Sequence, residues 1–132
     1  MATRIQRAES VCDDENVTSV LIVDDHPSFR ASARAVLEAE GFEVVGEAPD
    51  GESAIAACDE LRPDVVLLDV QLPDQDGFQV AARLTRNGAS VSVVLVSSRD
   101  GSDFGPLVEE SGARGFVPKA ELSGARLAEL LR

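Results

Sequence analysis

The chain has 132 residues, of which 44% are hydrophobic and 27% charged, a balance typical of one soluble globular domain. Its 24 acidic residues against 12 basic ones give a formal net charge of −12, which argues against nucleic-acid binding by this chain, since that binding depends on Lys and Arg neutralising phosphates. The sequence contains no apolar run long enough to cross a bilayer and no signal-peptide pattern, so we expect no membrane association and a cytoplasmic location.

Residues 1–18 are polar and charged, and we predict a flexible N-terminal extension there. After it, short apolar runs alternate with segments of helical periodicity. The runs predict five strands, at 20–23, 42–46, 64–69, 91–96 and 115–119. The segments predict five helices, from Pro27 up to Gly41, then at 51–61, 78–86, 104–111 and 122–131. Gly105 and Pro106 are poor helix formers, which makes the fourth helix the weakest of these predictions.

The order of these elements predicts the fold class. Strands that are apolar on both faces and alternate with helices indicate a parallel sheet covered on both sides. Five strands in this order predict a doubly wound, flavodoxin-like α/β fold with the spatial strand order 2-1-3-4-5. We therefore assign residues 19–132 to one domain.

Polar residues lie where four of the predicted strands end. In such a fold, functional residues lie outside the carboxyl ends of the strands, near the point where the strand order reverses. Three carboxylates there would repel each other by roughly 4 kcal/mol per pair at about 4 Å and an effective dielectric near 20, so we expect a divalent cation, and Mg²⁺ suits an open oxygen site. A carboxylate beside a cation, a lysine and a hydroxyl can accept a phosphoryl group. The residues concerned are Asp24, Asp25, Asp69, Ser97 and Lys119.

Four motifs match a known family. They are Val-Asp-Asp-His-Pro at 23–27, Leu-Asp-Val at 68–70 followed by Leu-Pro-Asp-Gln-Asp-Gly at 72–77, Val-Ser-Ser at 96–98, and Gly-Phe-Val-Pro-Lys at 115–119. In this order and spacing they resemble the signatures of the response-regulator receiver domains of two-component signalling, over about residues 19–132. The Asp-Asp-His-Pro opening resembles the subfamily that is often joined to a helix-turn-helix output.

The resemblance implies roles for the acidic residues. Asp69 would accept a phosphoryl group from a sensor histidine kinase, in a switch that assists its own phosphotransfer and dephosphorylation without acting as a separate enzyme. Asp25, Asp69 and the backbone carbonyl of Gln71 would bind Mg²⁺ directly, while Asp24 would act mainly through water. His26 is the only histidine, and we interpret it as a helix-start residue near the pocket.

The resemblance also implies a switch. Lys119 and Ser97 would contact the phosphoryl group, and Phe116 would be the aromatic residue that turns inward on activation. The face formed by the fourth helix, the fifth strand and the fifth helix would then bind a downstream protein or a second copy of the chain. Two features depart from the family pattern: Phe116 cannot hydrogen-bond as the frequent tyrosine does, and Pro118 precedes Lys119 where the family usually has a proline after the lysine.

Other interpretations stay open at this point. A Mg²⁺-dependent phosphatase with an aspartate nucleophile is one alternative, although such families commonly need a second acid where this chain has Gln71. An interaction module that ignores phosphorylation is another, and the chain could equally be the receiver of a longer regulator. Asp74 and Asp76 are interpreted as turn or cap residues.

Overall fold

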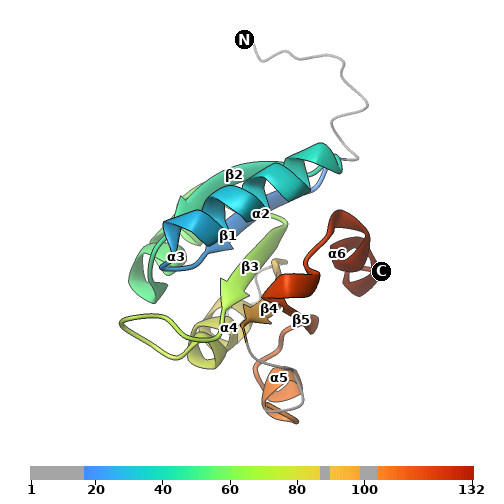
Figure 1. Ribbon diagram of the computed structural model, residues 1–132. Coiled ribbons are helices and arrows are strands. Elements are labelled where there is room, and N and C mark those ends of the chain that lie inside the picture. The colour runs from blue at the N-terminus through green and yellow to red at the C-terminus, as the bar shows by residue number, and fades with distance from the viewer. Residues whose placement is uncertain (1–16, 87–89, 99–103) are drawn as a thin grey trace.

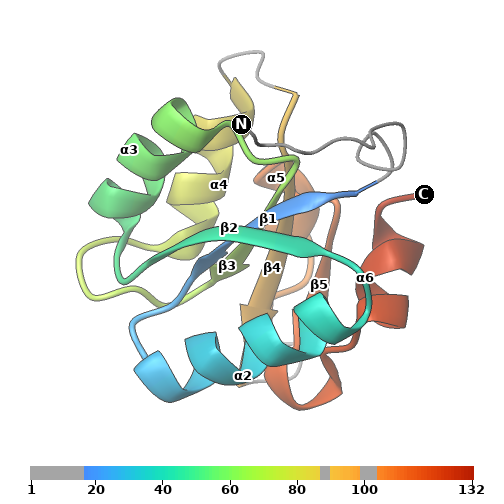
Figure 2. The ribbon, with the colours of Figure 1, turned by 90° about the horizontal axis from the view of Figure 1, so that it is seen from above.

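The protein is a five-stranded, wholly parallel sheet with helices on both faces (Figures 1 and 2). The computed structural model describes residues 17–86, 90–98 and 104–132. The strands lie in the order β2-β1-β3-β4-β5, which confirms the predicted doubly wound fold. Their bounds are β1 Ser19–Val23, β2 Glu43–Ala48, β3 Val65–Asp69, β4 Ser92–Ser97 and β5 Gly115–Pro118.

The helices divide between the two faces of the sheet. Helices α2 and α6 pack against one apolar cluster, while α3, α4 and α5 pack against the other. Figure 2 shows α2 on the side of the sheet opposite to α3 and α4. The bounds are α2 Pro27–Ala39, α3 Gly51–Leu61, α4 Gly77–Arg86, α5 Leu107–Glu110 and α6 Gly124–Leu130, with a 3-10 helix, η3, at Lys119–Glu121.

Alternating side chains of the strands supply both clusters. In β1, Leu21 and Val23 face α3 and α4, whereas Val20 and Ile22 face α2 and α6, and all four side chains are fully buried. Each such side chain contributes about 1.5–3 kcal/mol by leaving water. The strands are apolar on both faces because both faces are covered, and this is the pattern from which the parallel sheet was predicted.

Most observed boundaries lie within one or two residues of the predicted ones, and three of the differences have a clear cause. Strand β2 continues two residues past 46, because its last residues pair with the end of β1. Strand β5 ends at Pro118, and Lys119 begins η3. Helix α6 begins at Gly124 because the side chain of Ser123 caps it, accepting a hydrogen bond of 3.0 Å from the backbone N–H of Arg126.

The predicted helix at 104–111 is wrong in extent. Only the four residues of α5 are helical, and the three residues before it form a turn in which Gly105 has a φ of +47°. Pro106 stands at the N-cap position and brings no side-chain hydrogen bond. The glycine and the proline therefore shorten the helix, as their low helix propensity suggests.

Two further expectations concern the N-terminal extension and the membrane. Residues 1–16 of the predicted extension lie outside the described residues, and Val17 and Thr18 belong to no helix or strand. In the part of the chain that the structure describes, every helix is too short or too polar to cross a membrane. The cytoplasmic location stays a prediction.

Candidate functional site

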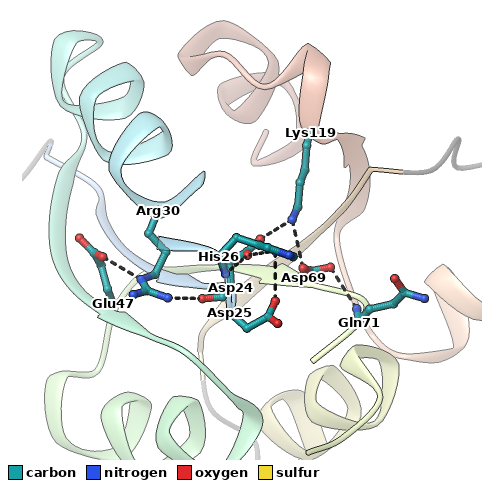
Figure 3. A network of polar contacts seen from close by, with 8 residues as sticks. All are labelled: Asp24, Asp25, His26, Arg30, Glu47, Asp69, Gln71 and Lys119. Atoms are coloured by element: carbon teal, nitrogen blue, oxygen red, sulfur yellow. Dashed lines mark hydrogen bonds and ion pairs between the residues drawn. The ribbon is translucent and has the colours of Figure 1, made fainter. Parts of the chain in front are cut away.

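The end of β1 places Asp24 inside the protein. Its side chain is 0% exposed, and its backbone N–H donates a 3.0 Å hydrogen bond to the carbonyl of Ala48 at the end of β2. Arg30, on the first turn of α2, donates a 2.6 Å hydrogen bond to the Asp24 carbonyl, and its Nε lies 3.0 Å from Glu47 Oε1 (Figure 3). Strand pairing and an arginine therefore fix the backbone at Asp24.

The end of β3 places Asp69 beside it. Asp69 is 4% exposed, and its Oδ1 accepts a 3.0 Å hydrogen bond from the backbone N–H of Gln71. Helix α4 starts close to this turn, because Gly77 donates a 2.8 Å hydrogen bond to the carbonyl of Val70. A Cβ atom at Gly77 would collide with the backbone of Asp69 and Val70, so only glycine permits this approach.

Lys119 connects the two carboxylates (Figure 3). Its Nζ lies 2.5 Å from Asp24 Oδ2 and 3.1 Å from Asp69 Oδ2, and the ammonium also sits 4.6 Å from the centre of the Phe29 ring. The lysine reaches this position from η3, directly after Pro118. The unusual position of the proline therefore does not prevent Lys119 from facing Asp69.

Burial and charge shift the ionisation of the pair. Burial raises the pKa of Asp69, and the nearby charge of Asp24 raises it further, against the lowering effects of the Gln71 N–H and Lys119. Burial alone would lower the pKa of Lys119, but its hydrogen bonds and ion pairs with Asp24 and Asp69 outweigh burial, so its pKa is raised. Lys119 therefore stays charged between two acids.

The donor atoms around Asp24 fit a cation. One ligand atom from each of Asp24, Asp25, His26 and Asp69 lies within 4.8 Å of the other three. Asp24 Oδ2 is buried, and the Lys119 ammonium, 2.5 Å away, is the cation that compensates its charge. Asp25 is more open, with 37% of its side chain exposed. Several carboxylate oxygens so close together, one of them on an open carboxylate, suit a partly hydrated divalent ion.

The remaining predicted residues are Ser97, which ends β4, and Phe116, which lies within β5. Ser97 is 1% exposed and pairs in register with Pro118, so it lies next to the strand that delivers Lys119. Phe116 is half-buried, on the face of the sheet covered by α3, α4 and α5. Its ring lies 5.4 Å from that of Phe104, which in turn lies 5.4 Å from that of Phe78.

The loop after β3 is attached to α3. Asp74 accepts hydrogen bonds from the backbone N–H groups of Gly51 and Glu52, at 2.9 and 3.0 Å. The bond from Gly51 lowers the pKa of Asp74, and the bond from Glu52 lowers it further. Asp76 accepts a 2.7 Å hydrogen bond from the N–H of Phe78 at the start of α4. Both acids are therefore cap residues, as predicted, and Asp74 caps a helix from another segment.

The sequence interpretation missed two residues of the site. Phe29 and Arg30 lie on the first turn of α2, where Phe29 faces the Lys119 ammonium and Arg30 holds the Asp24 carbonyl. The only signal in the sequence was that both residues closely follow the Asp24-Asp25 pair, at the start of the predicted helix. The role of the Gln71 carbonyl as a metal ligand stays a prediction.

The site and the fold define a class of protein, and a family comparison agrees with it. The sequence pattern of the family described as Response regulator receiver domain matches residues 20–132. The match covers most of the chain, so the chain belongs to the response-regulator receiver domain family.

The relatives that the chain matches include a DNA-binding transcriptional activator and a response regulator. The chain is 34% identical over 103 residues to the DNA-binding transcriptional activator EvgA of Escherichia coli K12, and 36% identical over 114 residues to the response regulator GacA of Pseudomonas viridiflava. These alignments cover 78% and 86% of this chain but 50% and 51% of the relatives. The chain therefore spans about half the length of the curated relatives it matches.

Solved structures agree with this assignment. The signal receiver domain of NarL from Mycobacterium tuberculosis matches with a TM-score of 0.78 at 34% identity, covering 87% of this chain and 97% of that one. A two-component response regulator of the LuxR family from Aurantimonas sp. SI85-9A1 matches with a TM-score of 0.78 at 30% identity, covering 88% and 86%. The resemblance found in the motifs is confirmed.

Proposed function

We propose that residues 19–132 form a receiver whose Asp69 accepts a phosphoryl group from the phosphohistidine of a sensor histidine kinase. One observation carries the proposal: the Lys119 ammonium lies 3.1 Å from Asp69 Oδ2, beside a partly buried cluster of acids at the carboxyl ends of β1 and β3. Members of the family are signalling proteins, and the family match favours neither the phosphatase nor the phosphorylation-independent module.

The chain's own groups prepare Asp69 for the transfer. An oxygen of Asp69 attacks the phosphorus, the phosphorus–nitrogen bond breaks, and the imidazole of the kinase keeps the electron pair. The Gln71 N–H and Lys119 each hold one oxygen of the Asp69 carboxylate, so its orientation is fixed before the donor arrives. Lys119 then stabilises negative charge on the transferring oxygens.

A divalent cation belongs to this site. Asp24, Asp25, Asp69 and the backbone carbonyl of Gln71 are the groups that would hold Mg²⁺, with Asp24 acting mainly through water. When bound, Mg²⁺ would neutralise the carboxylates and the incoming phosphoryl oxygens. The convergence of carboxylate oxygens from Asp24, Asp25 and Asp69 within 4.8 Å of one another supports this assignment.

The switch follows from the added charge. A phosphoryl group brings about −1.5 to −2 charges to Asp69. Ser97 and Lys119 would move toward it, and Phe116 would fill the space that Ser97 leaves. The face made of α5, β5 and α6 would then favour a downstream protein or a second copy of this chain, as a shift between two populations.

The test is direct phosphorylation. After incubation with acetyl phosphate and Mg²⁺, intact-mass measurement should show one added phosphoryl group, and Asp69→Asn should abolish it. Asp64→Asn is the matched control, because Asp64 precedes the same strand at its opposite end and should leave the incorporation unchanged. Phosphorylation of the Asp69→Asn protein would contradict the assignment, and steady turnover of a phosphomonoester would favour the phosphatase.

A further inference from the structure

A groove runs along α3 on the side of α4, and Figure 2 shows the two helices next to each other on one face of the sheet. Its volume is about 740 Å³, and none of the residues assigned to phosphorylation lines it. The apolar Ile55, Cys58 and Val91 line the groove and are only half-buried. Apolar surface is therefore left in contact with water, where a covering segment would gain free energy by burying it.

The N-terminal segment joins the domain at one end of this groove. Asp64 lines the groove, and its Oδ2 accepts hydrogen bonds from the backbone N–H and the hydroxyl of Ser19, at 2.9 and 3.1 Å. Residues 1–16 lie outside the described residues and enter the domain through Val17 and Thr18, directly before that contact. Ten extended residues span about 33 Å, whereas the 11 residues of α3 rise only about 16 Å, so the segment can turn back and follow the helix to its start.

The segment carries its charges in separate groups. Read backward from Val17, it has acids at 13–15, the apolar pair Val11-Cys12 and, beyond Glu9, the basic residues Arg7 and Arg4. A segment with this order fits a groove that has a basic residue near Asp64, an apolar middle and an acidic residue at its far end.

The groove has its charges in the matching order. The exposed Arg62 lies next to the Asp64 end, the apolar residues around Cys58 follow, and the exposed Glu52 lies at the other end of α3. Asp59 and Arg83 also line the groove and add one charge of each sign. The segment and the groove are therefore complementary in charge when the segment runs back along α3.

We propose that residues 4–15 bind in the groove between α3 and α4 and cover Cys58. Because the segment is tethered to the domain, its effective concentration at the groove is on the order of 1 mM, and weak contacts are enough to keep it bound. The bound segment would join α3 to α4. This inference goes beyond the proposed function and does not depend on the phosphorylation of Asp69.

Cys58 is a natural reporter of this contact. Burial raises the pKa of its thiol to about 11, so the thiol reacts slowly and changes in its exposure can be followed as changes in rate. The experiment measures alkylation by iodoacetamide, an uncharged reagent, in the full chain with Cys12→Ser, which leaves Cys58 as the one thiol.

The charge reversal Arg4→Glu/Arg7→Glu in this parent should raise the alkylation rate of Cys58 at least about threefold, because attraction to Glu52 becomes repulsion and releases the segment. Added acids near the thiol would by themselves raise its pKa and slow the reaction, so a faster rate reports exposure. Glu52→Arg, added to the reversed protein, exchanges both signs and should return the rate to within about twofold of the parent.

Arg126→Glu/Arg132→Glu is the matched control, because it changes the net charge equally, on and after α6, which covers the opposite face of the sheet. It should leave the rate unchanged. Equal rates in the parent and the Arg4→Glu/Arg7→Glu protein would overturn the inference. So would a rate that falls as the protein concentration rises, which would make a second copy the occupant, or a rise that Glu52→Arg does not reverse, which would indicate a general loss of stability.

Discussion

Helices α3 and α5 cover the same face of the sheet, yet they are attached to it very differently. Helix α3 has 11 residues, its N-terminus is capped by Asp50, and it receives a second cap from Asp74. Helix α5 has four residues, none of them buried, and its N-cap side chain makes no hydrogen bond. Because Asp74 belongs to the loop after Asp69, α3 is fixed to the site itself. Helix α5 instead packs against the core through the half-buried Val108, and the ring of Phe104, in the turn before α5, contacts those of Phe78 and Phe116.

The difference in attachment between α3 and α5 indicates which part of the domain can change conformation. Local stability varies within a domain, and the segments that move are those with few buried contacts. The acids of β1 and β3 lie in the strongly attached half, so their geometry is preorganised for chemistry. The turn before α5 contains Phe104, whose ring lies 5.4 Å from that of Phe116, so the weakly attached segment adjoins one of the two proposed switch residues. Each prediction below tests this contrast.

The largest effect is expected at Lys119. In Lys119→Met the buried Asp24 loses the ammonium that lies 2.5 Å from its Oδ2, and this should lower the free energy of unfolding by about 3 kcal/mol without Mg²⁺. Added Mg²⁺ should restore part of the loss by neutralising the acids. Urea unfolding with and without Mg²⁺ measures both values, and Arg86→Met, at the exposed end of α4, is the control. A loss below about 0.5 kcal/mol is the size expected for an ordinary surface substitution. It would contradict a stabilising ion pair between Lys119 and the buried Asp24.

A pair of glycines gives the next largest effect. Gly77→Ala should cost about 2 kcal/mol by overpacking against Asp69 and Val70 and should also slow the phosphorylation of Asp69. Gly105→Ala, before α5, meets open space and should cost only about 1 kcal/mol from its positive φ, with phosphorylation unchanged. Thermal unfolding and the rate of phosphate incorporation separate the two. The contrast would fail if both alanines slowed phosphorylation equally.

The attachment of α3 should depend on pH through Asp74. Its pKa is lowered in the folded protein, so the charged carboxylate stabilises the fold above its unfolded pKa of about 4, and this contribution is lost as pH falls through the lower folded pKa. Asp74→Asn should therefore reduce Tm at pH 7, and the difference from wild type should shrink below about pH 4. Glu60→Gln, exposed on the same helix, is the control. A Tm difference that is independent of pH would contradict the role of the charge.

The sequence predicted the fold because β1, β3 and β4 are apolar on both faces. It misplaced the end of β2, where the exposed Glu47 interrupts the apolar pattern although the backbone continues to pair with β1. It overestimated α5, because periodicity alone does not weigh the cost of Gly105 and Pro106 against the few contacts that the helix gains.

The sequence predicted the part of the site whose residues are positioned by the ends of the strands. Asp24, Asp69 and Lys119, the chain's only lysine, lie together because parallel strands end at one edge of the sheet. The contacts of Phe29 and Arg30 depend on how α2 crosses that edge, which no local pattern encodes. His26 was placed near the pocket, but its contacts with both acids depend on side-chain rotamers, which the sequence pattern does not specify either.

The smallest expected effect compares two exposed leucines. Leu61 ends α3 with 42% exposure, and Leu107 begins α5 with 46% exposure. Each leucine-to-alanine change should alter the free energy of unfolding by less than about 0.5 kcal/mol, because each side chain already lies largely in water. They should differ after phosphorylation: Leu107→Ala should weaken self-association or partner binding of the phosphorylated chain, since Leu107 lies on the α5-β5-α6 face. Leu61→Ala should leave both unchanged. Sedimentation with and without acetyl phosphate measures self-association. An effect of Leu61→Ala alone would contradict the prediction, because it would place the output surface on α3 and not on α5.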